Sequence, residues 1–232
     1  GVQEVYGMHN MPGLPAGSFA IRPGAILAAV DSFEIVVTGR GGHGAIPHQA
    51  VDTTLAASQI VTALQSVVSR NVDPLKNAVL SVCSFRTDTD AFNVIPDAVT
   101  LKGTVRTLDA DVRDLVEMRL AEVATATARA FGAEARVAYR RMVAPTVNAA
   151  ENTEFAAQVA EAVAGSVQRD MPPVMAGEDF AFMLEQRPGA YIMLGNGDSA
   201  MVHHPAYDFN DEAIPAGCSW FAELVERRMP AA

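Results

Sequence analysis

The chain has 232 residues, and 17 Lys and Arg side chains stand against 27 Asp and Glu, which gives a formal net charge of −10 at pH 7. This acidity argues against a nucleic-acid-binding protein, because binding to a phosphate backbone needs clustered Lys and Arg. Half of the residues are hydrophobic and 19% are charged, a mix typical of a folded globular protein. No apolar stretch approaches the roughly 20 residues that span a bilayer, so no membrane span is expected.

The first residues and the two cysteines indicate the cellular compartment of the protein. The chain begins at Gly1 without a basic segment or an apolar leader, so the sequence predicts no signal peptide. Cys83 and Cys218 lie far apart in apolar segments. This spacing favours reduced, structural thiols in a cytoplasmic protein over a disulfide framework.

The first part of the chain reads as strand fragments, tight turns and one half-buried strand. Residues 1–30 are rich in Gly and Pro and include an expected strand at Val2–Met8. From Ser32 onward apolar and polar residues alternate, which predicts a strand that ends at the glycine cluster 39–44.

Two helices and three more strands follow. A helix is expected over 52–70, with Asp52 as its N-cap, and a second over 111–131, with Gly132 just past its end. Strands are expected over 78–85, 98–108 and 135–139. The resulting order, βαββαβ, is that of a ferredoxin-like domain. Its second strand lies at a sheet edge, so the sequence also predicts a homodimer through that edge.

After Pro145 helices and strands alternate, as in an α/β domain. The expected elements are a helix over 152–165, a loop over 171–177, a helix over 178–186, a strand over 190–194, a loop over 203–211 and a helix over 214–228. We therefore expect an α/β protein with an inserted domain, 32–144, and a flanking domain built from 1–31 plus 145–232.

All five histidines lie in Gly/Pro-rich loops or at strand ends, where α/β proteins place their sites. His9 follows the first expected strand, and its imidazole suits Zn²⁺ or a similar metal; a hydrogen-bonded loop histidine is the alternative. His203 and His204 are adjacent. On an extended segment they would point to opposite faces, so that one faces a site, whereas a polar surface loop would explain both.

The glycine-rich segment 39–48 displays His43 at its tip. It lacks the Lys-Ser/Thr of a phosphate-binding loop, but its glycines allow a ligand to approach the backbone. His43 could therefore donate a hydrogen bond to a developing oxyanion, unless the glycines serve only a turn. His48 is expected to act locally, at the start of the next helix.

Three further polar residues, Asn93, Arg106 and Glu178, are also candidates. Asn93 and Arg106 flank the third strand of the inserted domain, and a guanidinium can bind a carboxylate in bidentate fashion. A solvated arginine is the alternative. Glu178 opens an expected helix, so helix capping is its default role and a place in the site is second.

Five motifs, in this order, resemble the two-metal amidohydrolases, a family that includes aminoacylase, carboxypeptidase G and hippurate hydrolase. They are Gly7-Met-His-Asn-Met-Pro12, the segment 39–48, Asn93-Val-Ile-Pro-Asp97 with Gly103-Thr-Val-Arg106, Gly177-Glu-Asp-Phe180 and His203-His-Pro-Ala-Tyr-Asp-Phe-Asn-Asp211. The branch that the chain resembles most is that of hippurate hydrolase and the indole-acetyl-amino-acid hydrolases.

The resemblance implies a zinc-peptidase-like α/β catalytic domain interrupted by a lid or dimerisation domain. It implies hydrolysis of the amide bond of N-acyl amino acids by two divalent metals, Zn²⁺ or Mn²⁺, with a glutamate as general base. His9 and His203 would be metal ligands, His203 being preferred because the family pattern is His-x-Pro. His43 would reach the scissile carbonyl, across the dimer, while Asn93 and Arg106 would hold the substrate.

The chain also departs from this family. Family members carry a Gly-Cys-Gly-His-Asp-type motif and a Glu-Glu pair before the His9 segment, and neither occurs in this sequence. Two histidines cannot hold two metals, so we expect a C-terminal portion that does not bind both metals fully and is inactive alone. Three alternatives remain open: a truncated or proteolysed amidohydrolase, a split subunit that needs a partner chain, and a non-catalytic dimeric scaffold.

Overall fold

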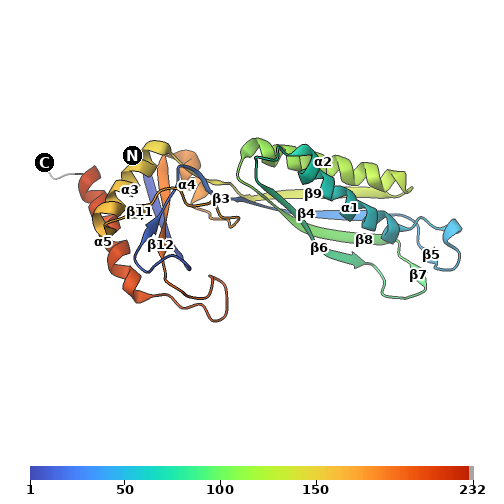
Figure 1. The fold of residues 1–232 in the computed structure, drawn as a ribbon. Helices are drawn as coiled ribbons and strands as arrows, with labels where there is room; N and C mark the ends of the chain where they lie inside the picture. Colours follow the sequence, from blue (N-terminus) through green and yellow to red (C-terminus); the bar gives the residue numbers. More distant parts are fainter. Residues whose placement is uncertain (230–232) are drawn as a thin grey trace. The chain divides into compact units, whose positions relative to one another are not determined.

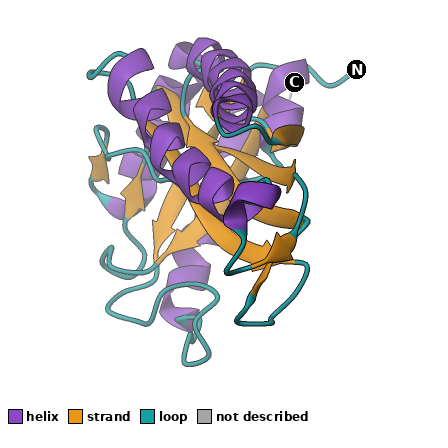
Figure 2. Ribbon diagram, turned by 90° about the vertical axis from the view of Figure 1, so that its right-hand side faces the viewer, coloured by secondary structure: helices purple, strands orange, loops and turns teal. Residues whose placement is uncertain are grey.

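The computed structural model describes residues 1–229, which form two compact units (Figure 1). Unit 1 comprises Gly1–Leu27, Thr146–Val174 and the chain from Glu178 onward. Unit 2 comprises Ala28–Pro145 together with Met175–Gly177. Both units combine helices with strands, as the colouring by secondary structure shows (Figure 2). In residues 1–229, no helix is both long enough and apolar enough to cross a membrane.

Unit 2 is built on a four-stranded antiparallel sheet in the order β6-β8-β4-β9. The strands are β4 (Ala29–Thr38), β6 (Ala78–Thr87), β8 (Ala98–Thr107) and β9 (Glu134–Val143), and the helices are α1 (Thr53–Asn71) and α2 (Ala110–Ala130). Strand β6 lies at an edge, as expected. The predicted βαββαβ order of these six elements is the observed one.

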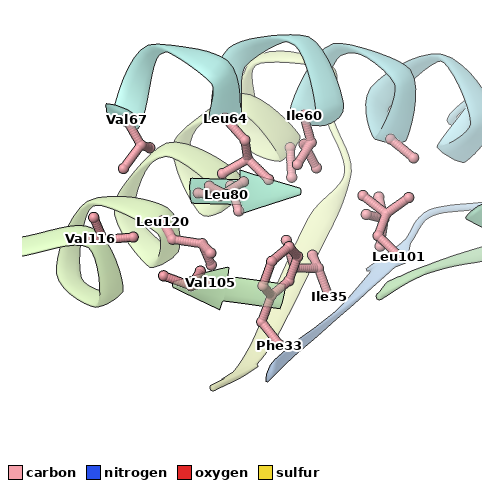
Figure 3. Close-up of a cluster of buried hydrophobic side chains, with 14 of the residues drawn as sticks. Phe33, Ile35, Ile60, Leu64, Val67, Leu80, Leu101, Val105, Val116 and Leu120 are labelled. Atoms are coloured by element: carbon pink, nitrogen blue, oxygen red, sulfur yellow. The ribbon is translucent and has the colours of Figure 1, made fainter. Parts of the chain in front are cut away.

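The core of unit 2 lies between one face of this sheet and both helices (Figure 3). Phe33 and Ile35 of β4 are buried, because the polar residues that alternate with them point to the other face. Gly103 of β8 leaves room for the Phe33 ring, since a Cβ there would lie 2.2 Å from a ring carbon. Helix α1 begins as expected, with the Asp52 carboxylate accepting a hydrogen bond from the Leu55 N–H at 2.9 Å.

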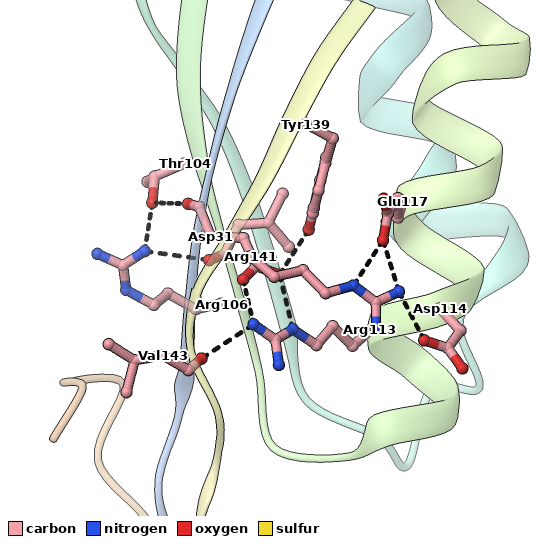
Figure 4. Close-up of polar contacts among 10 residues, drawn as sticks. Asp31, Thr104, Arg106, Arg113, Asp114, Glu117, Tyr139, Arg141 and Val143 are labelled. Carbon is pink, nitrogen blue, oxygen red and sulfur yellow. Dashed lines mark hydrogen bonds and ion pairs between the residues drawn. The ribbon is translucent and has the colours of Figure 1, made fainter. Parts of the chain in front are cut away.

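A buried ion pair marks the start of β4 (Figure 4). The Asp31 carboxylate is fully buried and accepts hydrogen bonds from Arg113 of α2 at 2.5 and 2.9 Å. Tyr139 of β9 donates its hydroxyl to the same carboxylate at 2.7 Å. Burial and this hydrogen bond raise the pKa of Tyr139 above its ordinary value. The strand therefore starts at Ala29, before the expected 32, because a partner within the fold neutralises its acidic residue.

Unit 1 is built on a second sheet, in the order β1-β12-β2-β11, with β1 parallel to β12. The strands are β1 (Val5–Met11), β2 (Phe19–Ala20), β11 (Val167–Gln168) and β12 (Gly189–Gly195). A separate antiparallel pair joins β3 (Gly24–Leu27) to β10 (Thr146–Asn148).

The two faces of this sheet carry different residues. Helices α3 (Ala150–Ala164) and α5 (Ile214–Arg228) pack on the face that bears Ile192 and Leu194, with the buried Trp220 between them. The alternate residues of β12, Tyr191 and Met193, belong to a smaller cluster with Met11, Leu14 and Phe180, among others. The short helix α4 (Ala181–Gln186) begins directly after Phe180 of this smaller cluster.

Further sequence expectations differ from the structure. The first strand runs from Val5 to Met11, so His9 lies within it and not after it. The helix expected over 178–186 is limited to Ala181–Gln186. Cys83 and Cys218 are free thiols, as expected, but both are exposed despite their apolar neighbours in sequence.

Candidate functional site

His9 is placed at the carboxyl end of a parallel strand pair. It lies on β1 directly opposite Met193 of β12, and it is half-buried. Its Nδ1 lies 2.6 Å from the carbonyl oxygen of Asn10, a distance at which an Nδ1–H donates to that oxygen. This arrangement leaves the lone pair on Nε2, which is the state a metal ligand needs.

The His203 loop follows β12 and ends at the same edge of the sheet. His203 has a φ of 68°, the left-handed region, and is the one non-glycine residue with a positive φ among residues 1–229. Such a conformation costs about 1–3 kcal/mol and persists only where the surroundings impose it. The expectation of an extended 203–204 segment is therefore wrong, and alternation of faces does not apply to this pair.

The neighbouring His204 is part of a turn. Its N–H donates to the Met201 carbonyl at 3.1 Å, and its Nδ1 accepts from the Ala206 N–H at 3.1 Å. The first of these bonds is made by the His204 backbone, and the second ties its ring to its own loop. Of the two imidazoles, His203 is thus the one that is better placed to bind a ligand.

Two asparagines fasten the His203 loop to the sheet. The Asn10 amide donates to the Tyr207 hydroxyl, which links the residue after His9 to this loop. The buried Asn196, just after β12, donates to the Asp208 carbonyl at 2.9 Å and accepts from the Asn210 N–H at 2.9 Å. His9 and the His203 loop are therefore held at the carboxyl ends of parallel strands, where α/β sheets bind their ligands.

Glu178 does not cap a helix, contrary to its default expectation. Helix α4 begins at Ala181 with no side-chain cap. The Glu178 carboxylate accepts the Tyr191 hydroxyl at 2.6 Å and the Phe180 N–H at 3.3 Å. Burial raises the pKa of this carboxyl, but these hydrogen bonds and the charge of His9 outweigh burial and lower the pKa below its ordinary value.

His43 and Asn93 are brought together in unit 2 by a short two-stranded sheet. His43 on β5 (Gly42–His43) stands opposite Val94 on β7 (Val94–Ile95), and the Gly44 N–H donates to the Asn93 carbonyl at 2.8 Å. Ile95 is buried, whereas His43 and Val94 are on the exposed side. His48 is exposed in the short 3-10 helix that follows, Pro47–Gln49.

The hydrogen bonds of His43 select its tautomer. Its Nδ1 accepts from the Ala45 N–H at 3.0 Å. In the neutral imidazole the proton then resides on Nε2. His43 therefore presents an N–H donor to solvent, which is the group an oxyanion needs.

Arg106 lies on the four-stranded sheet of unit 2 and not on the two-stranded sheet of His43. It is near the last residue of β8, whereas Asn93 precedes the first, and the strand rises about 27 Å from Ala98 to Arg106 at roughly 3.4 Å per residue. Its Nη1 donates to the Thr104 hydroxyl and, at 3.0 Å, to the Val105 carbonyl. One copy of unit 2 does not bring Arg106 together with His43 and Asn93.

The donor set for a metal is partial. A zinc site takes four ligands, three of them from protein even where water fills the fourth. Within residues 1–229, no group of three or more His, Cys, Asp or Glu side chains is close enough to hold a metal ion. The imidazoles of His9 and His203 suit Zn²⁺ or Mn²⁺, but a complete site needs further ligands.

Pattern analysis missed two residues of this region, Tyr191 and Tyr207. Tyr191 sits in an apolar strand, where a tyrosine is expected to pack like any aromatic residue. Tyr207 lies in a polar loop whose conformation no periodicity predicts. The one available signal was chemical, because a buried tyrosine hydroxyl needs a hydrogen-bond partner.

The chain was compared with known proteins. The family model "Peptidase family M20/M25/M40" matches residues 1–227. An N-acetylcysteine deacetylase of Bacillus subtilis is 39% identical over 226 residues, which are 97% of this chain and 58% of the relative. A hippurate hydrolase of Campylobacter jejuni is 40% identical over 223 residues, 95% of this chain and 58% of the relative.

A solved structure agrees with these relatives. The crystal structure of a dinuclear metal-binding peptidase of the M20 family, also from Bacillus subtilis, superposes with a TM-score of 0.82 at 30% identity, over 100% of this chain and 59% of that one. The chain thus spans a little over half the length of the proteins it matches. The motifs around His9, His43 and His203 led to the same family, and the chain belongs to peptidase family M20/M25/M40.

Proposed function

We propose that the protein containing this chain hydrolyses the amide bond of N-acyl amino acids with the help of two divalent metal ions. The observation that carries the proposal is the pair of His9 and the His203 loop, held at the carboxyl ends of β1 and β12 by the Asn10–Tyr207 hydrogen bond. A relative of this family is a dinuclear metal-binding peptidase, and two others are named for amide-bond hydrolysis, as a deacetylase and a hippurate hydrolase.

His9 and His203 contribute metal ligands in this proposal, and the remaining ligands come from polypeptide outside this chain. The incomplete ligand group within residues 1–229 supports that division. The metal ions, when bound, act as Lewis acids on the substrate carbonyl and on a water molecule. Zn²⁺ and Mn²⁺ both suit imidazole ligands. Residues 1–232 alone are then inactive.

His43 serves as the oxyanion donor. Its Nε2–H is set by the Ala45 hydrogen bond, and Asn93 lies beside it with an amide that can hold the same substrate. Arg106 binds the substrate carboxylate through the edge of its guanidinium that Thr104 and Val105 leave open. Arg106 lies at the end of β8, whereas Asn93, which is next to the His43 segment, precedes its start. We therefore propose that Arg106 and His43 act on one substrate only when two copies of the chain share a site.

Unit 2 is the lid and dimerisation domain in this proposal, and β6 is its pairing edge. Of the two edge strands, β9 carries Glu134, Arg136, Arg140 and Arg141, whereas Arg86 is the one charged residue of β6. Charged side chains protect an edge from pairing, so β6 is the edge that is open to a second copy. Val79 and Phe85 of β6 are exposed apolar residues there.

The incomplete ligand group also favours an alternative. A chain without a complete metal site could be a split subunit that needs a partner chain, or a dimeric scaffold without catalysis. The scaffold predicts a dimer without hydrolysis, whereas the split subunit predicts hydrolysis only after the partner chain is added.

Hydrolysis of a panel of N-acyl amino acids by the complete protein tests the function. Free amino acid is measured with N-acetyl and N-benzoyl substrates, before and after chelation of metals and after their return. We expect release that chelation abolishes and Zn²⁺ or Mn²⁺ restores. A protein that binds two metal equivalents but releases no amino acid from any of these substrates would exclude the proposed function.

A further inference from the structure

We propose that Glu178, held in place by Tyr191, is a positioning residue for the metal site at His9, where its carboxylate strengthens the binding of a divalent cation. The inference rests on the proposed function in one respect, that His9 binds a metal. It assigns no ligand role to Glu178, which would act through its charge. Unit 1 fixes the Tyr191–Glu178 pair through the backbone and the ring of Tyr191.

The backbone of Tyr191 is clamped by a buried side chain. The Asn148 Oδ1 accepts from the Tyr191 N–H at 2.7 Å, and the Asn148 Nδ2 donates to the Tyr191 carbonyl at 2.9 Å. Both residues are buried, with 2% and 4% of their surfaces exposed. A buried amide that satisfies both backbone groups of one residue fixes that residue more rigidly than packing alone does.

The Tyr191 ring is fixed in the same way. It lies against Gly7, its partner in the β1–β12 register, where a Cβ would approach ring atoms at 2.7 and 2.8 Å. The Phe180 ring packs against the Tyr191 ring at a centroid distance of 5.2 Å and also lies next to Gly7. Gly7 is therefore needed at this position, because any side chain would push the tyrosine ring away.

The fixed ring aims its hydroxyl at Glu178. The hydroxyl donates to Oε2 at 2.6 Å, a short hydrogen bond to an ionised acceptor. Burial, followed by the hydrogen bond to Glu178, raises the pKa of Tyr191, so the hydroxyl remains a donor. The Phe180 N–H holds the other oxygen, Oε1, at 3.3 Å. Two carboxylate oxygens offer about four acceptor positions, so lone pairs remain.

This carboxylate lies on the same face of the sheet as His9. Residues two apart on a strand share a face, so His9 points to the side on which the Tyr191 ring covers Gly7. That side is opposite to the one that packs on α3 and α5.

A carboxylate next to a metal-binding imidazole has a known physical effect. Its charge adds attraction for the cation, and loss of a partner outside the ligand set weakens metal binding by about 10- to 100-fold. Glu178 is neither a helix cap nor paired with a Lys or Arg in residues 1–229. Its charge is thus available to a cation at His9.

The dissociation constants of Zn²⁺ and Mn²⁺ test this inference in the complete protein. They are measured by competition with a chelator for wild type, Glu178→Gln and Tyr191→Phe. The first substitution removes the charge and keeps the acceptor for the tyrosine hydroxyl; the second removes that hydroxyl and keeps the ring. Glu226→Gln, an exposed glutamate on α5, is the matched control.

We expect about 10-fold weaker binding of one metal in Glu178→Gln, a smaller loss in Tyr191→Phe and none in Glu226→Gln. The melting temperature of each metal-free variant should stay close to that of wild type. Weaker metal binding then reflects the lost charge and not a less stable fold. An unchanged dissociation constant in Glu178→Gln would overturn the inference alone. A wild-type protein that binds neither metal would instead overturn the proposed function beneath it.

Discussion

At the scale of single residues, hydrogen bonds prepare two imidazoles for opposite tasks. His9 places its Nδ1 against a backbone carbonyl, which leaves a lone pair on Nε2, whereas His43 accepts a backbone N–H at Nδ1, which leaves a proton on Nε2. The first state suits a metal ligand and the second suits an oxyanion donor. Sequence spacing located both histidines but could not assign their tautomers, because the bonds depend on local backbone geometry.

Replacement of His43 tests the oxyanion role. In the complete enzyme His43→Ala is expected to lower kcat by about 10²-fold or more, as loss of one oxyanion donor does. His48→Ala, an exposed histidine of the same segment, is the control and should leave kcat near the wild-type value. Steady-state hydrolysis of one N-acyl amino acid measures both. An unchanged kcat in His43→Ala would remove His43 from catalysis.

Replacement of each loop histidine tests which one binds metal. His203→Ala should abolish the binding of at least one metal equivalent, whereas His204→Ala should retain both, because the His204 ring is bonded within its own turn. Metal content by elemental analysis of the purified complete protein decides between them. Full retention in His203→Ala together with loss in His204→Ala would reverse the assignment.

At the scale of elements, hydrophobic periodicity predicted which segments are helices and strands. It did not predict the boundaries that depend on contacts between distant residues. The alternation through Phe33 and Ile35 predicted β4, and the capping residue Asp52 predicted where α1 begins. The buried Asp31 hid the true start of β4, since its neutralising partner is 82 positions away. The expected strand ended before His9 because His9 and Asn10 are polar. The strand in fact continues through both, since β1 is an edge strand and edge strands accept polar residues.

The Asp31–Arg113 pair should be central to the stability of unit 2. Asp31→Ala is expected to lower the free energy of unfolding by about 3–5 kcal/mol, because it leaves the Arg113 charge buried without a partner. Lys102→Ala, which breaks the exposed pair with Glu34, should cost under about 1 kcal/mol. Urea denaturation of both variants measures the difference. Equal losses of unfolding free energy in the two variants would show that the buried pair stabilises unit 2 no more than the exposed pair does.

The edge strand β6, with its single charged residue, gives a prediction about assembly. Val79→Lys places a charge on this exposed edge position and is expected to shift the protein from dimer to monomer. Ala138→Lys, on the opposite edge strand β9, is the matched control and should leave the dimer intact. Sedimentation velocity of the complete protein distinguishes the two. A dimer that survives Val79→Lys and dissociates in Ala138→Lys would place the interface on β9.

At the scale of the whole molecule, the candidate residues are divided between two units. Unit 1 contains His9 and His203, and unit 2 contains His43, Asn93 and Arg106. The motifs predicted each of these residues but not that Arg106 ends β8 while the His43 segment pairs with the chain before β8, since strand pairing decides that. The chain covers 58% of each of two curated relatives, and the proposed metal site is incomplete within residues 1–229.

The most direct test of a shared catalytic site is complementation between two inactive variants of the complete enzyme. His9→Ala removes a metal ligand, and His43→Ala removes the oxyanion donor of the other copy. Equal amounts are mixed, dissociated and reassociated. Half of the dimers then contain one copy of each variant, and each of these has one intact site of two. One quarter of all sites are therefore intact, so hydrolysis should recover to about one quarter of the wild-type rate. A mixture no more active than its two parents would contradict a site built from two copies of the chain.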